Sequence, residues 1–201
     1  MIRRVFAQAV VDLGGSSDVD VALDRLTKAY GPQRAYHNLR HVEAVLETAE
    51  RLMPEGSAHV VLALIYHDAV YDPRAKDNEE RSAQMAREEL RSLGVPNEDL
   101  DEVARLILLT KHHQVSPGDE AGSAVVDADL AILQASPEEY DRYAAAIREE
   151  YAWVPEEEYR IGRAKVLEGL MSRKLFSSAL LDEEMARANM RREIDRLRSS
   201  H

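Results

Sequence analysis

The chain of 201 residues contains no cysteine. This absence excludes disulfide bonds and thiolate zinc sites, and it fits a reducing cytosol. Long apolar runs are also missing, since no stretch approaches the ~20 residues that a membrane-spanning helix needs. The N-terminus begins with basic Arg3 and Arg4, as a signal peptide does, but Gln8 and Asp12 interrupt the apolar stretch that should follow. We therefore expect an ordinary amphipathic helix there, a cytoplasmic protein and no membrane partner.

The period-two alternation of apolar and polar residues that is typical of strands is absent as well. Glycine and proline instead separate segments with helical spacing, which predicts an all-α fold. The expected helices cover residues 3–13, 18–30, 38–53, 57–71, 78–93, 97–113, 123–134, 136–152, 156–173 and 182–199. This length is enough for one well-buried core and too short for two, so we expect a single domain over 1–201.

The formal net charge is −11, with acids and bases interspersed along the chain. Affinity for a nucleic-acid duplex comes largely from neutralising phosphates, so this charge argues against a duplex as partner. A small anionic substrate would need a local cluster of positive charge, which a metal ion and a few basic side chains can supply.

The most informative feature of the sequence is the doublet His67-Asp68, which ends the apolar run 60–66. Ionisable groups in such a place are costly unless a charge or a metal compensates them. His41 lies upstream and Asp129 downstream, each beside an apolar helical pattern. Adjacent helical residues point about 100° apart, so His67 and Asp68 can share an ion only if it lies between their two directions. The pattern predicts four metal ligands, namely His41, His67, Asp68 and Asp129.

Two imidazoles and two carboxylates suit a six-coordinate divalent ion such as manganese, iron, cobalt, nickel or magnesium, with positions open for water and substrate. Each ligand also has a structural interpretation. His41 fits an exposed helix position, His67-Asp68 a structural pair, and Asp129 a local helix cap for which Asp127 serves equally well.

Five ordered motifs carry a resemblance to a known family: Tyr-His-Asn-Leu-Arg-His (36–41), His-Asp-Ala-Val-Tyr-Asp (67–72), Asp-Asn-Glu-Glu-Arg-Ser-Ala (77–83), Thr-Lys-His-His (110–113) and Asp-Ala-Asp-Leu (127–130). With them the chain resembles the HD superfamily of metal-dependent phosphohydrolases, and in particular an uncharacterised bacterial subgroup. The resemblance implies an HD-type helical bundle with a metal-site core at about 36–134 and C-terminal helices at about 136–199 packed on it. It also implies hydrolysis of a small phosphate ester, a nucleotide being the substrate class that it suggests.

The expected catalytic residues are Asp68 and Asp72. Asp72, four residues after Asp68, should lie on nearly the same helix face and within reach of a metal-bound water. Relatives that hydrolyse guanosine tetraphosphate carry a Glu-Asp pair where this chain has Tyr71-Asp72, which argues against that substrate. The alternative for Asp72 is a turn before Pro73.

The expected substrate-binding residues are His37, Arg40, Lys111 and His112, which could neutralise charge on phosphoryl oxygens. For His37 a local hydrogen bond at the helix start is an equal alternative. For Lys111 and His112 the alternative is the ordinary preference for cations at a helix C-terminus.

Two other functions stay open. Some HD-fold proteins are di-iron oxygenases, and His112 or His113 could supply the extra ligands that a second iron needs. The other is a non-catalytic module that binds a metal or a nucleotide without turnover.

Apolar residues of the C-terminal segment, such as Val166, Leu167, Leu170 and Met171, pack either internally or against a second copy in a homodimer.

Overall fold

The computed structural model describes residues 1–199, and within them every regular element is a helix. The chain divides into two compact units, Met1–Asp129 and Leu130–His201, and each is described by itself. The all-α prediction is confirmed. The predicted packing of the C-terminal helices on the metal-site core stays a prediction. Within residues 1–199, no helix has both the length and the apolar character needed to cross a membrane.

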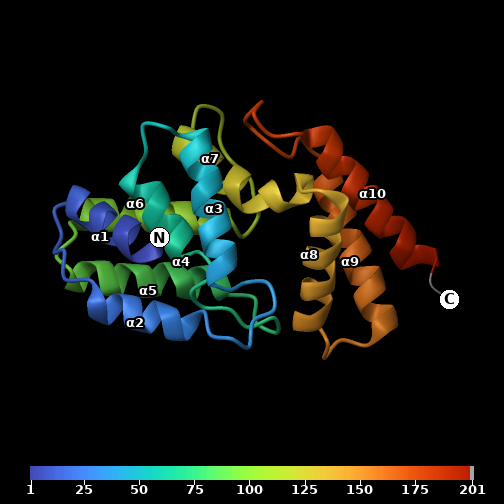
Figure 1. The fold of residues 1–201 in the computed structure, drawn as a ribbon, viewed down its shortest axis with the longest axis horizontal. Coiled ribbons are helices and arrows are strands. Elements are labelled where there is room, and N and C mark those ends of the chain that lie inside the picture. The colour runs from blue at the N-terminus through green and yellow to red at the C-terminus, as the bar shows by residue number, and fades with distance from the viewer. Residues whose placement is uncertain (200–201) are drawn as a thin grey trace. The chain divides into compact units, whose positions relative to one another are not determined.

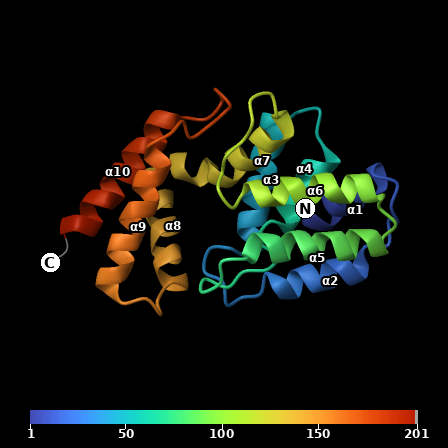
Figure 2. The same ribbon diagram turned by 180° about the vertical axis from the view of Figure 1, so that it is seen from behind.

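The first unit holds seven helices (Figure 1). They are α1 (Ile2–Asp12), α2 (Asp20–Ala29), α3 (Leu39–Leu52), α4 (Ala58–Tyr66), α5 (Asn78–Ser92), α6 (Asn97–Leu109) and α7 (Glu120–Leu130). Helix α4 is the centre of this unit, since it packs against α1, α3, α5 and α6. Helices α5 and α6 lie side by side, as Figure 2 shows.

Helix α4 is apolar on nearly all sides, as expected of a helix surrounded by others. Its fully buried side chains include Leu62, Leu64, Ile65 and Tyr66. Burying one large apolar side chain stabilises a fold by about 1.5–3 kcal/mol, so this helix anchors the unit. The Tyr66 hydroxyl donates to the buried Glu89 carboxylate at 2.8 Å, which satisfies its polar end.

Helix α4 ends earlier than the sequence predicts. The expected helix 57–71 stops at Tyr66, and residues 67–70 form a turn. Arg34 donates to the backbone oxygens of Asp68 and Ala69 at 2.5 and 3.1 Å. A side chain therefore satisfies two carbonyl groups of the turn that follows the helix.

Two further boundaries differ from the prediction. Helix α6 ends at Leu109 instead of residue 113, and α7 begins at Glu120 instead of residue 123. The expected helix 123–134 is α7 followed by a 3-10 turn, η1 (Ala131–Gln134).

The second unit contains η1, α8 (Pro137–Glu150), α9 (Glu156–Met171) and α10 (Glu183–Ser199), with α10 packed against η1, α8 and α9. A buried ionic network joins its helices. The Glu193 carboxylate accepts from the Tyr140 hydroxyl at 2.6 Å and from Arg163 Nε at 2.8 Å. A second Arg163 nitrogen donates to Glu193 at 3.2 Å and to the Tyr143 hydroxyl at 3.2 Å. Both carboxylate oxygens of Glu193 are thus matched by donors of the same unit.

Candidate metal centre

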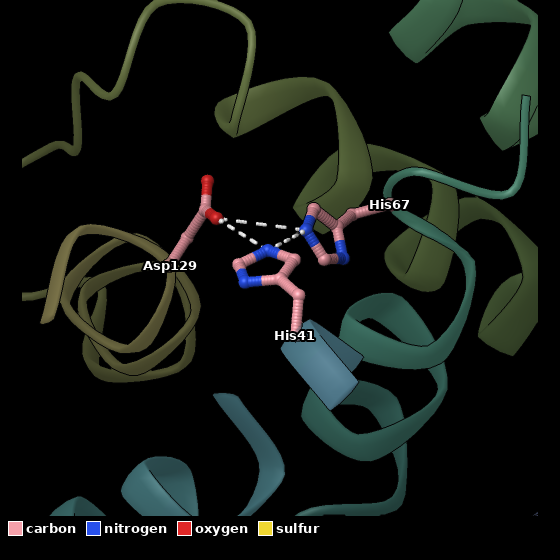
Figure 3. Close-up of side chains that lie close together, drawn as sticks. All are labelled: His41, His67 and Asp129. Carbon is pink, nitrogen blue, oxygen red and sulfur yellow. Dashed lines mark hydrogen bonds and ion pairs between the residues drawn. The ribbon is translucent and has the colours of Figure 1, made fainter. Parts of the chain in front are cut away.

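Three helix ends bring the candidate ligands together. His41 lies in the first turn of α3, which begins after Asn38, whose side chain accepts the backbone N–H of Arg40. His67 follows the last residue of α4, and Asp129 lies in the last turn of α7. Figure 3 shows the side chains of His41, His67 and Asp129 pointing toward one another.

The donor atoms of these three residues converge. His41 Nε2 lies 3.1 Å from His67 Nε2, and Asp129 Oδ1 lies 3.3 Å from the first and 3.5 Å from the second (Figure 3). Both histidines are buried, with 6% and 1% of their surface exposed. His41, His67 and Asp129 therefore form a group that could hold a metal ion.

The tautomer of His67 supports metal binding. Its Nδ1 lies 2.8 Å from the backbone oxygen of Leu64. A carbonyl oxygen only accepts, so Nδ1 carries the proton and Nε2 of the neutral ring presents a lone pair. A backbone partner of this kind orients the imidazole of a metal-binding histidine.

The spacing of the donors also fits an ion. A metal–ligand bond of about 2.1 Å places neighbouring donors roughly 3.0 Å apart in octahedral geometry and roughly 3.4 Å apart in tetrahedral geometry. Of the distances among the three residues, 3.1 and 3.3 Å fall in this range and 3.5 Å lies just above it. Without a cation or a proton between them, lone pairs would face one another in a buried place.

Asp68 reaches the same centre from the turn after α4. Its Oδ2 lies 3.0 Å from His67 Nε2 and 3.6 Å from His41 Nε2. The carboxylate thus contacts both imidazoles, and its role as fourth ligand stays a prediction. Of the two acids in the motif 127–130, the structure brings Asp129 to the histidines, while Asp127 is buried within α7.

The electrostatics of the cluster favour a cation at its centre. Burial by itself lowers the pKa of His67, but the Asp68 and Asp129 carboxylates outweigh it and raise that pKa well above its ordinary value. Burial lowers the pKa of His41. Burial alone raises the pKa of a carboxyl, yet the imidazoles around Asp68 and Asp129 hold both carboxyl pKa values below their usual range. The site therefore keeps its carboxylates ionised and attracts positive charge.

A third imidazole extends the cluster. His113 Nε2 lies 3.0 Å from Asp129 Oδ2, the carboxylate oxygen other than the one nearest to His41 and His67. His113 has a φ of 50°, a left-handed backbone conformation that is uncommon outside glycine and is often found at functional sites. His112, which the sequence places at the substrate, is exposed.

The expected substrate-binding residues lie in different surroundings. The His37 ring stacks on Tyr71 with centroids 4.2 Å apart and meets the His41 ring edge-on at 5.9 Å. Arg40 is exposed, directly before His41. Lys111 donates to the backbone oxygen of Lys76 at 2.9 Å and forms an ion pair with Glu80. Of these cations, Lys111 already has an acidic partner.

Asp72 has the contacts of a turn residue. It is exposed, and its Oδ1 accepts the backbone N–H of Arg74 at 2.9 Å. The expectation that it shares a helix face with Asp68 is wrong, because α4 ends at Tyr66. Its predicted role as proton acceptor thus loses the geometry on which it rested.

Arg34 is the residue of this site that the sequence does not reveal. Besides the carbonyl oxygens of Asp68 and Ala69, it contacts that of His37 at 3.3 Å, so it joins the turn after α4 to the segment before α3. No short motif marks an arginine that binds backbone carbonyls. Its place two residues before the motif 36–41 was the only available signal.

Comparison of the chain with protein-family models, curated proteins and solved structures finds no match.

Proposed function

We propose that the protein is a metal-dependent phosphohydrolase of the HD type, with a small phosphate ester as substrate and a nucleotide as the favoured class. The observation that carries this proposal is the convergence of His41, His67 and Asp129 at buried helix ends. Three donors leave coordination positions for water and substrate, as a hydrolytic metal site requires.

The residues present fit a divalent ion with mixed nitrogen and oxygen ligands, such as manganese, iron, cobalt, nickel or magnesium. His41, His67 and Asp129 would hold it, and Asp68 is the fourth proposed ligand. Such an ion lowers the pKa of a bound water from about 16 toward neutrality and polarises a phosphoryl oxygen.

Nearby side chains are candidates for orienting the water, accepting its proton and neutralising charge. Asp68 is a better candidate than Asp72 for orienting water or accepting its proton, because Asp68 Oδ2 contacts both ligand imidazoles and Asp72 is engaged in a turn. Arg40 and His37 flank His41 and can neutralise charge that develops on the phosphoryl oxygens. Lys111 can do so only by leaving Glu80.

The test is phosphate release from a panel of nucleotides and small phosphomonoesters by protein stripped of metal and reloaded with each ion in turn. We expect release that depends on metal and is abolished in His41→Ala. His59→Ala is the matched control, since His59 pairs with Asp99 at 2.8 Å on another part of the first unit. The absence of phosphate release with every ion, in a folded and metal-loaded protein, would reject the hydrolase proposal.

The contact of His113 with Asp129 favours one second candidate, a di-iron oxygenase, because it adds an imidazole to the cluster. Two irons per chain and oxygen consumption in place of phosphate release would support that function. Metal or nucleotide binding without any product would instead support the non-catalytic module.

A further inference from the structure

Helix α9 presents an unusual exposed face in the second unit. Its members are Glu158, Ile161, Gly162, Lys165, Val166 and Gly169, all exposed. Ile161 and Val166 have 65% and 56% of their surface exposed. The opposite side of the helix is buried through Ala164 and Leu167. Large apolar side chains exposed together on one helix face are typical of an interaction surface.

The two glycines of this face lie within the helix, where glycine is unfavourable because it loses more backbone freedom than any other residue. A Cβ added at Gly162 or at Gly169 would meet no atom within 4 Å. Packing inside the chain therefore does not require glycine at either position. Glycine at these positions instead suits the close approach of another helix, because the separation of two packed helices depends on the side chains at their contact.

The order of residues along this face is self-complementary. In an antiparallel pair with a two-fold axis between Lys165 and Val166, Gly162 lies opposite Gly169 of the second copy. The same register places Ile161 opposite Leu170 and Val166 opposite the apolar stem of Lys165. We propose that the exposed face of α9 pairs with the same face of a second copy of this chain, in antiparallel orientation.

The charges at the two ends of α9 also match. Its first turn carries Glu157 and Glu158, and Arg173 and Lys174 follow its end. The antiparallel register brings the acidic end of each helix to the basic end of the other. It also sets the positive end of one helix dipole beside the negative end of its partner. One patch thus supplies both sides of a symmetric contact, as a two-fold interface requires.

The absence of cysteine from the chain allows a direct test by disulfide cross-linking. We expect the double variant Gly162→Cys/Gly169→Cys of the full chain to form covalent dimers rapidly under mild oxidation, since residue 162 faces residue 169 of the partner. Either single variant should cross-link far less. The matched control is Glu184→Cys/Arg191→Cys, two exposed positions with the same spacing of seven residues on α10.

Sedimentation over a wide concentration range supplies the second measurement. The original chain should associate reversibly to a dimer, and Gly162→Gln should shift it to monomer with an unchanged or higher melting temperature, because the monomer has room for the side chain. A monomer at every concentration, with cross-linking no faster than the control, overturns the proposal. Faster cross-linking of a single variant overturns the antiparallel register. Neither measurement depends on the proposed hydrolase activity.

Discussion

The two units bury charged side chains in opposite ways. In the second unit, Glu193 is matched within the protein by Arg163 and Tyr140, which donate to both of its oxygens. In the first unit, Nε2 of His41 and Nε2 of His67 lie close together and against carboxylate oxygens, so a proton or a metal ion must lie between them. Burial of charge is costly in both places.

The difference distinguishes a structural network from a binding site. A network that is complete within the chain stabilises the fold and offers nothing to a ligand. A cluster of acceptors is completed only by a cation from outside, whether a proton or a metal ion. Buried charge alone therefore does not identify a functional site, and the balance of donors and acceptors does.

The largest effect should follow from breaking the complete network. Arg163→Met leaves Glu193 buried without its cationic partner, which we expect to lower the free energy of unfolding by about 3–5 kcal/mol. Urea unfolding of the metal-free protein measures this loss. An unchanged unfolding midpoint would contradict the structural assignment of the network, and metal affinity of the folded fraction should stay as in the original chain.

The cluster of His41, His67 and Asp129 should instead stabilise the fold when a metal ion is added. The original chain should gain about 2.7 kcal/mol of stability when the free metal concentration is 100 times the dissociation constant. His67→Ala should lose this gain while the metal-free protein remains folded. The measurement is unfolding with and without metal, with His59→Ala as the control that keeps the gain. A full gain in His67→Ala would remove this residue from the ligand set.

A smaller effect should come from the arginine that positions the cluster. Arg34→Lys retains the charge but cannot bridge the carbonyl oxygens of Asp68, Ala69 and His37. We expect metal affinity to fall by about 10–100-fold, as it does when residues supporting metal ligands are changed. Calorimetric titration measures this, and Arg40→Lys is the control from the same segment. Equal affinities for the two variants would show that Arg34 does not position the site.

The smallest effect is a dependence of stability on pH, whose sign differs between the metal-free stability and the stability gained from metal. Because the folded pKa of His67 is raised, its contribution to metal-free stability is present below its ordinary pKa of about 6.5 and is lost as pH rises toward the folded value. His41, with a lowered pKa, opposes part of this change. The stability gained from metal should instead grow with pH, by up to about 1.4 kcal/mol per unit for each proton displaced.

Unfolding curves at several pH values, with and without metal, measure both slopes. His67→Ala should flatten them. Equal slopes for the original chain and His67→Ala would be the contrary result.

Much of the fold and part of the site could be read from the sequence. Helical spacing predicted an all-α chain, and the apolar run 60–66 predicted a buried helix, because an amphipathic or apolar pattern is a local property of the sequence. The doublet His67-Asp68 was informative because ionisable groups seldom follow such a run without compensation. Its interpretation as a metal site agrees with the convergence of His67 on His41 and Asp129.

The errors have a common cause. The helix predicted over 57–71 ends at Tyr66, and Arg34, distant in sequence, binds the carbonyl oxygens of the following turn. The role expected of Asp72 rested on that helix. Between His112 and His113, the left-handed backbone at His113 decided which imidazole meets Asp129. Local periodicity contains no information on any of these contacts.

The sequence by itself determined the helical class, the apolar centre of the first unit and the set of residue types able to bind a divalent ion. These depend on the chemistry of each residue and its near neighbours. Only the tertiary structure decided that His113, not His112, meets Asp129, that Arg34 supports the turn, and that Arg163 pairs with Glu193. Each of those outcomes depends on distances between residues far apart in the chain, which packing sets and sequence spacing does not.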